Sequence, residues 1–128
     1  MKRIAAHLIC FTPQVLYYTS YIELSDDYKL SGIYPLQEEI AGTVFINGAI
    51  LMVPEKHHSS VSEIEEKTKQ IITDREKLPL AILLDELGLS APPVIGETYH
   101  ILHLSGLNLS SSKFSANHSS SNGYIQRL

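Results

Sequence analysis

The sequence predicts a mostly-β (α+β) domain: a small β-sandwich or partly closed barrel from N- and C-terminal strands, with a two-helix insertion. Over Leu16–Leu24 the side chains alternate with the period of two of a half-buried strand. Between positions 59 and 89 the apolar spacing changes to three and four residues, as on one helix face. We therefore expect a single domain over 1–128, with an N-terminal β part at 1–54, a helical insertion at 59–89 and a C-terminal β part at 97–128.

The N-terminal part contains three predicted strands around an acidic turn. β-Branched and aromatic residues predict strands over Ile4–Phe11 and Leu16–Leu24. Ser25-Asp26-Asp27-Tyr28 is predicted to form a hairpin turn, because aspartate tolerates left-handed geometry and hydrogen-bonds its own backbone. The returning strand, Lys29–Tyr34, ends at Pro35, since proline cannot donate to a strand ladder.

A longer strand is predicted over Thr43–Val53, and it carries Asn47-Gly48. Asn-Gly is a strong signal for a type I′ hairpin turn, so this stretch is either a tight hairpin or one bent strand with a bulge. Because it is apolar on both faces, we expect it in the middle of the sheet or sandwich.

The insertion is predicted to hold two helices. The first has an apolar face of Val61, Ile64, Thr68, Ile71 and Ile72. Ser60 with Glu63, or Ser62 with Glu65, offers its capping box. The second begins at Leu78-Pro79, carries a stripe of Leu80, Leu83, Leu84 and Leu87, and ends before Gly88.

The C-terminal part is predicted to return to the same sheet. Glu97–Leu104 alternates as a strand, Ser110–Ser121 is a serine-rich loop, and Gly123–Leu128 is a last short strand. We expect one of the first two strands to hydrogen-bond with Thr98–Leu104 or Tyr124–Leu128.

Composition and charge restrict the class of partner and the compartment. The 128 residues are 44% hydrophobic and 19% charged, with a formal net charge of −4, and scattered basic residues argue against a nucleic-acid partner. No apolar run approaches the roughly 20 residues of a membrane span, so we expect no membrane partner and a cytoplasmic location. The single cysteine, Cys10, lies in an apolar run and is expected to be a buried structural thiol.

The N-terminal motif resembles a known family. Two strands, the acidic turn, a third strand and then Phe45-x-Asn47-Gly48-x-Ile50 are similar to the composite β-domain that flanks the barrel of amidohydrolases of the cytosine deaminase and chlorohydrolase type. Tyr28 stands where that family usually has glycine. At the other end, His103–Leu109 resembles the return from the barrel, and Ile125–Leu128 resembles the terminal strand.

The resemblance implies a shared β fold without the family's catalytic barrel. The family continues with a Pro-Gly step and a metal-binding His-x-His pair, whereas this chain reads Val53-Pro54-Glu55-Lys56-His57-His58. None of the family's metal ligands has a match here. The resemblance covers about two thirds of the chain.

The residues themselves suggest no catalytic, cofactor-binding or metal site, so none is assigned. On a strand, the adjacent His57 and His58 would point to opposite faces, although on a loop they could chelate one ion. His100 and His103 are also opposite-facing, and His7 could approach either of them across the sheet. The carboxylate pairs Asp26-Asp27 and Asp85-Glu86 are expected at the solvated surface.

Five tyrosines crowd the first hairpin: Tyr17, Tyr18, Tyr21, Tyr28 and Tyr34. They indicate either cross-strand pairs on an exposed sheet face or an oligomer or partner surface, with a ligand pocket as a further alternative.

We therefore expect a non-catalytic interaction or assembly module that resembles the β-domain of amidohydrolases. We expect it to form a homo-oligomer, and its possible protein partner is a full-length hydrolase. One alternative is an amidohydrolase-like hydrolase or an accessory subunit of a full-length metal-dependent hydrolase. A second alternative is a β-domain that binds a small ligand.

Overall fold

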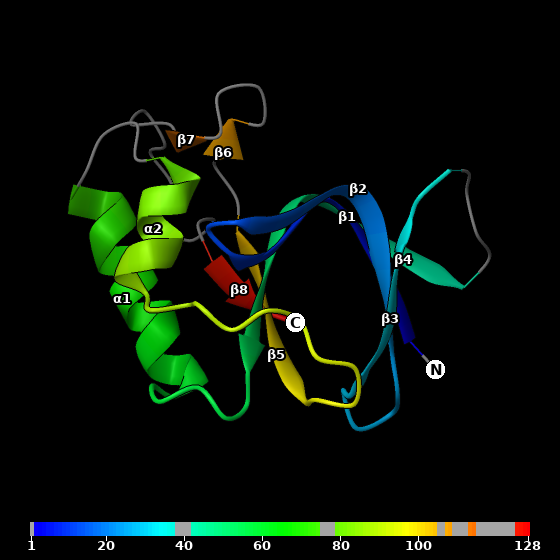
Figure 1. The fold of residues 1–128 in the computed structure, drawn as a ribbon. Helices are drawn as coiled ribbons and strands as arrows, with labels where there is room; N and C mark the ends of the chain where they lie inside the picture. The colour runs from blue at the N-terminus through cyan, green and yellow to red at the C-terminus, as the bar shows by residue number, and fades with distance from the viewer. Residues whose placement is uncertain (1, 38–41, 75–78, 105–106, 109–112, 115–124) are drawn as a thin grey trace.

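A computed structural model describes residues 2–37, 42–74, 79–104, 107–108, 113–114 and 125–128. Six strands form one mixed sheet in the order β3-β2-β1-β4-β5-β8, and the two helices lie together on one side of it (Figure 1). The strands of this sheet are β1 Lys2–Thr12, β2 Val15–Leu24, β3 Leu30–Pro35, β4 Thr43–Pro54, β5 Tyr99–Leu104 and β8 Ile125–Arg127. The helices are α1 Val61–Asp74 and α2 Leu80–Glu86, and a separate two-stranded sheet pairs β6 Leu107–Asn108 with β7 Lys113–Phe114.

The predicted fold class is confirmed: the domain is mostly β and carries a two-helix insertion. The main sheet curls until the starts of β3 and β5 meet at the bridge between Lys29 and Thr98. Leu30 N–H donates to the Glu97 carbonyl at 2.9 Å, and Tyr99 N–H donates to the Tyr28 carbonyl at 3.0 Å. Of the two predicted alternatives, a small sandwich and a partly closed barrel, the structure is therefore the partly closed barrel. Among the described residues, β3 and β5 meet at one end of the barrel only.

The expected direct pairing of the first two strands with the C-terminal strands is wrong. β4 lies between them, parallel to β1 and antiparallel to β5. Its second half, Ala49–Val53, is fully buried, and a strand covered on both faces belongs inside a sheet. The N- and C-terminal strands still share one sheet, because β4 connects them.

Asn47-Gly48 forms a bulge in one bent strand and not a hairpin. Ala6 pairs with Ile46 but Leu8 pairs with Ala49, so β4 has one extra residue at this point. Gly48 has a φ of 117°, and a Cβ atom there would lie 3.2 Å from the Leu104 carbonyl oxygen. Only glycine combines this backbone conformation with so close an approach of β5.

The predicted hairpin turn joins β2 to β3. Ser25 N–H donates to the Lys29 carbonyl at 2.9 Å, and Tyr28 N–H donates to the Ser25 carbonyl at 3.0 Å. Tyr28 has a φ of 63°, the left-handed conformation in which glycine is the usual residue. Its hydroxyl accepts a hydrogen bond from Lys2 Nζ at 2.7 Å, which holds the turn against the start of β1.

The curled sheet buries apolar side chains on both of its faces. The inner core contains Ile4, Ala6, Ile9, Phe11, Ile22, Leu24, Leu30, Ile50, Met52, Tyr99 and Ile101. The core under the helices contains Leu8, Cys10, Ala49, Leu51, Val53, Ile64, Leu80, Leu83, Leu84, Leu87, Leu89, Leu102 and Leu104. Cys10 is fully buried, and burial raises the pKa of its thiol far above the usual range, so the thiol is an unreactive part of this core.

Local signals place both helices. Glu63 N–H donates to Ser60 Oγ at 3.2 Å, and Ser60 N–H donates to Glu63 Oε1 at 3.3 Å, which confirms the first of the two predicted capping boxes. Gly88 has a φ of 73° and ends the second helix as predicted.

No helix within the described residues is long and apolar enough to cross a membrane. Most of the serine-rich stretch 110–121 and the Ile72 side chain lie outside the described residues.

Replacing Leu84 by alanine should lower the free energy of unfolding by about 2–5 kcal/mol, because the side chain is fully buried and its removal leaves a cavity. Urea denaturation of both proteins measures the difference. Ile82→Ala is the matched control, since Ile82 is on the same helix but 47% exposed, and it should cost less than about 1 kcal/mol. Equal losses at the two positions would show that α2 does not pack on the sheet.

Candidate functional site

The bulge in β4 brings two of the predicted histidines to one asparagine. His7 Nε2 donates to Asn47 Oδ1 at 3.0 Å, and His103 Nε2 donates to the Asn47 carbonyl at 3.1 Å. The predicted approach of His7 to His103 is therefore mediated by Asn47. Because both Nε2 atoms are engaged in these hydrogen bonds, the arrangement ties β1, β4 and β5 together at the bulge.

His57 and His58 lie on the loop between β4 and α1, where their rings stack with centroids 4.2 Å apart. Ser59 N–H donates to His57 Nδ1 at 3.1 Å, and His57 Nε2 lies 3.2 Å from the Gly88 carbonyl. Nδ1 is thus an acceptor, and Nε2 carries the proton and donates to Gly88. With both ring nitrogens of His57 occupied, the pair fastens the loop to the end of α2 and leaves His57 no lone pair for a metal.

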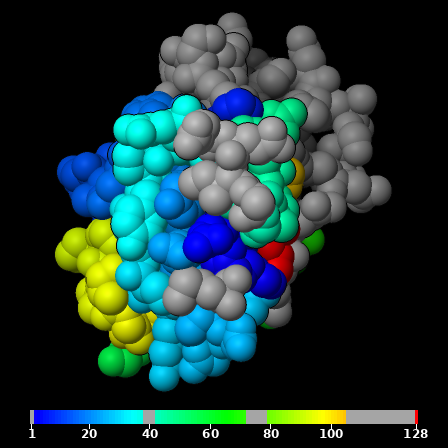
Figure 2. Space-filling view, turned by 90° about the vertical axis from the view of Figure 1, so that its right-hand side faces the viewer, coloured from blue at the N-terminus to red at the C-terminus, as the bar shows by residue number. Residues whose placement is uncertain are grey.

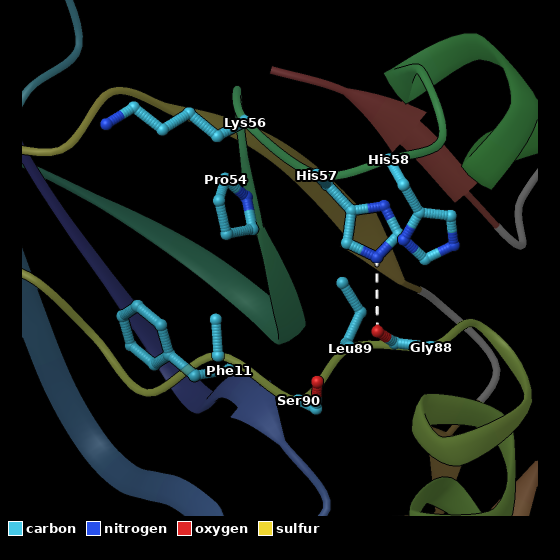
Figure 3. A pocket seen from close by; sticks show the side chains of 9 residues that line it. Phe11, Pro54, Lys56, His57, His58, Gly88, Leu89 and Ser90 are labelled. Carbon is cyan, nitrogen blue, oxygen red and sulfur yellow. Dashed lines mark hydrogen bonds between the residues drawn. The ribbon is translucent and has the colours of Figure 1, made fainter.

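A cavity of about 260 Å³ lies beside this histidine pair. Figure 3 shows Phe11, Leu89 and Ser90 in the lower part of the view, with Pro54, His57 and His58 above them. None of the described residues that line the cavity is a carboxylate. Lys56 also lines the cavity, and its exposed Nζ lies 3.6 Å from Glu97 Oε2. The described lining offers apolar contact, a hydroxyl and two imidazoles, and no carboxylate is paired with the imidazoles for acid–base catalysis.

Three of the four paired carboxylates are exposed, as the sequence predicts, and Glu86 is half-buried. Asp26 and Asp27 are exposed in the first turn, and the hydrogen bond from the Ser25 hydroxyl lowers the pKa of Asp27. Asp85 is exposed on α2. Among the described residues, no group of three or more His, Cys, Asp or Glu side chains could hold a metal ion.

An aromatic row crosses the outer face of the sheet. Tyr34 pairs with Tyr21, Tyr21 with Ala5, and Ala5 with Phe45, so four residues of four neighbouring strands lie side by side. Tyr34 is 41% exposed and Phe45 48% exposed. Figure 2 looks onto this side of the molecule, with β3 in cyan on one side and the start of β4 in green on the other.

Small residues shape the aromatic row. The Tyr34 ring lies over Gly32, where a Cβ atom would come within 2.4 Å of the Tyr34 hydroxyl oxygen. The rings of Tyr21 and Tyr34 lie 5.3 Å apart, and the His7 ring meets Phe45 edge-on at 5.0 Å. Ala5 itself is fully buried between its neighbours. Tyr21 and Tyr34 thus lie together at one end of the row, and Phe45 lies with His7 at the other end, beyond the buried Ala5.

The structure divides the five clustered tyrosines. Tyr17 and Tyr28 pack against the inner core, Tyr21 and Tyr34 belong to the aromatic row, and Tyr18 is 60% exposed outside the row, opposite Leu8. Sequence reasoning does not find Phe45, because its place beside Ala5 depends on the parallel pairing of β1 with β4. In the sequence, Phe45 stands out only as the first residue of the motif Phe45-x-Asn47-Gly48-x-Ile50.

Purified, untagged protein should contain no stoichiometric zinc, iron or nickel, because a catalytic zinc needs about three converging protein ligands. Elemental analysis after dialysis is the measurement, with a known zinc protein carried through the same dialysis as the control. One equivalent of metal that disappears in His57→Ala or His103→Ala would contradict this expectation and favour the hydrolase alternative.

Comparison with known proteins assigns no family or function to this chain. The chain matches no family model, no curated protein and no solved structure.

Proposed function

We propose that this chain is a non-catalytic interaction module and that its binding surface is the outer face of the sheet. The observation that carries the proposal is the aromatic row of Tyr34, Tyr21, Ala5 and Phe45, which is in register across four strands and is partly open to solvent.

The chemistry of this face suits a protein surface as the partner. Tyrosine and phenylalanine are enriched in protein interfaces, where their rings are buried and tyrosine hydroxyls stay hydrated. Beside the row, Arg3 Nε pairs with Glu23 Oε2 at 3.1 Å, so the nearest charges on these strands already neutralise each other. An apolar centre with a polar rim is the usual anatomy of an interface.

The resemblance to the amidohydrolase β-domain supports the same proposal. That domain is the structural part of those enzymes, and the matching positions here carry none of the family's metal ligands. A β-domain without its barrel exposes surface that the barrel would cover, and burial of that surface favours association.

Site-specific photo-cross-linking in the cells that make the protein tests the surface. A benzophenone amino acid in place of Tyr34 should give discrete adducts on illumination, because the aromatic row is buried against a partner. The same substitution at Tyr18 is the matched control, since Tyr18 is more exposed but outside the row, and it should give none. Adducts that are absent at Tyr34, or equal at both positions, would overturn the proposal.

A further inference from the structure

Among the described residues, the first half of β4 has a strand on one side only. β1 pairs with Thr43–Ile46, but β5 begins its pairing at Ala49 and ends at Leu104. No strand among the described residues pairs with Thr43–Asn47 on the side away from β1. Val44 is 56% exposed there, and Phe45 is about half exposed. An open strand edge with exposed apolar side chains is a template for pairing with another strand.

We infer that this edge of β4 pairs antiparallel with the same edge of a second copy of the chain. The inference rests on the proposed function and places the second copy beside the aromatic row, because Phe45 belongs both to the open edge and to the end of that row.

The order of residues along this edge favours a second copy of the chain as the partner strand. In an isologous antiparallel pair, a two-fold axis at Phe45 places Phe45 opposite Phe45, Val44 opposite Ile46, and Thr43 opposite Asn47. Each residue then meets one of its own kind: aromatic, aliphatic or polar. Cross-strand pairs of this type are the stabilising unit of a sheet.

Registers with the two-fold axis at a neighbouring residue do not pair like residues with like. An axis at Ile46 would place Phe45 opposite Asn47, and an axis at Val44 would place Phe45 opposite Thr43. Like-with-like pairing of the edge therefore occurs only with the axis at Phe45.

Charge does not oppose the association at this edge. Each copy carries a formal net charge of −4, yet no charged residue occurs between Gly42 and Pro54. Charged side chains, lysine above all, and proline are the devices that commonly protect an edge strand from pairing, and residues 43–47 contain neither.

Pairing in this register extends the aromatic row. Opposite residues of an antiparallel pair point to the same face of the sheet, so the outer faces of the two copies lie on one side. Phe45 of one copy meets Phe45 of the other, and the row continues from four strands to eight. The dimer thus presents twice the surface that the proposed function uses.

Sedimentation velocity of the purified protein and two variants tests the interface. The wild type should sediment as a dimer of about twice 14.3 kDa. Val44→Lys should weaken the dimer at least tenfold, because it places lysine opposite Ile46 of the partner. Val44 is exposed on the face opposite to Phe45, so the substitution leaves the fold and the aromatic row intact. Val94→Lys is the matched control, since Val94 is 51% exposed elsewhere, and it should remain dimeric.

Cysteine cross-linking tests the register. Phe45→Cys should form an intermolecular disulfide under mild oxidation, because opposite Cα atoms lie about 4.5–5.5 Å apart and a disulfide spans about 4.4–6.8 Å. Val44→Cys should not, because the two copies of residue 44 would lie roughly 8 Å apart. The native Cys10 is fully buried and does not compete.

A monomeric wild type, a dimer that survives Val44→Lys, or equal cross-linking at residues 44 and 45 would each overturn the inference. The photo-cross-linking result at Tyr34 stands apart from these outcomes. Adducts at Tyr34 together with a failed edge dimer would leave the proposed function in place. An edge dimer without adducts at Tyr34 would overturn the proposed function alone.

Discussion

Burial of β4 on both faces is the constraint on which the rest of the domain depends. Ile50 and Met52 point into the inner core, while Ala49, Leu51 and Val53 point into the core under the helices. At roughly 25 cal/mol per Å² of apolar area removed from water, such a strand is stable only with covers on both sides. The curl of the sheet supplies one cover and the helical insertion supplies the other, so the two halves of the chain must meet around this strand.

The bulge at Asn47 and Gly48 separates the two roles of β4. After it, the strand lies between β1 and β5 and is fully buried. Before it, the strand keeps β1 as its neighbour and turns Val44 and Phe45 toward solvent. His7 and His103 hold the bulge through Asn47, so residues that could suggest acid–base chemistry instead maintain the boundary between core and surface.

Other polar side chains that could have taken part in acid–base catalysis also make structural contacts. His57 joins the β4–α1 loop to the carbonyl at the end of α2, and the exposed Asp27 is bound by Ser25 and Lys29 in the first turn. These side chains are engaged in local structure. The outer face differs, because its rings and the open edge beside them have apolar area that water still covers. The proposed association uses this surface.

Much of the secondary structure could be read from the chain. The Ser60–Glu63 capping box, the leucine stripe of α2, the acidic turn before β3 and the central position of the Thr43–Val53 strand all follow from spacing and turn chemistry within a few residues. Those signals are local, and the structure agrees with them because no distant contact competes.

Only the tertiary structure decided which strands are neighbours. β4 separates β1 from β5, Asn47-Gly48 became a bulge, and Ala5 was placed between Tyr21 and Phe45. Backbone hydrogen bonds are alike for every pair of strands, so the chain does not specify its partners residue by residue. The burial of β4 selects its neighbours, the register follows from that packing, and the aromatic face with its open edge exists only once the register is set.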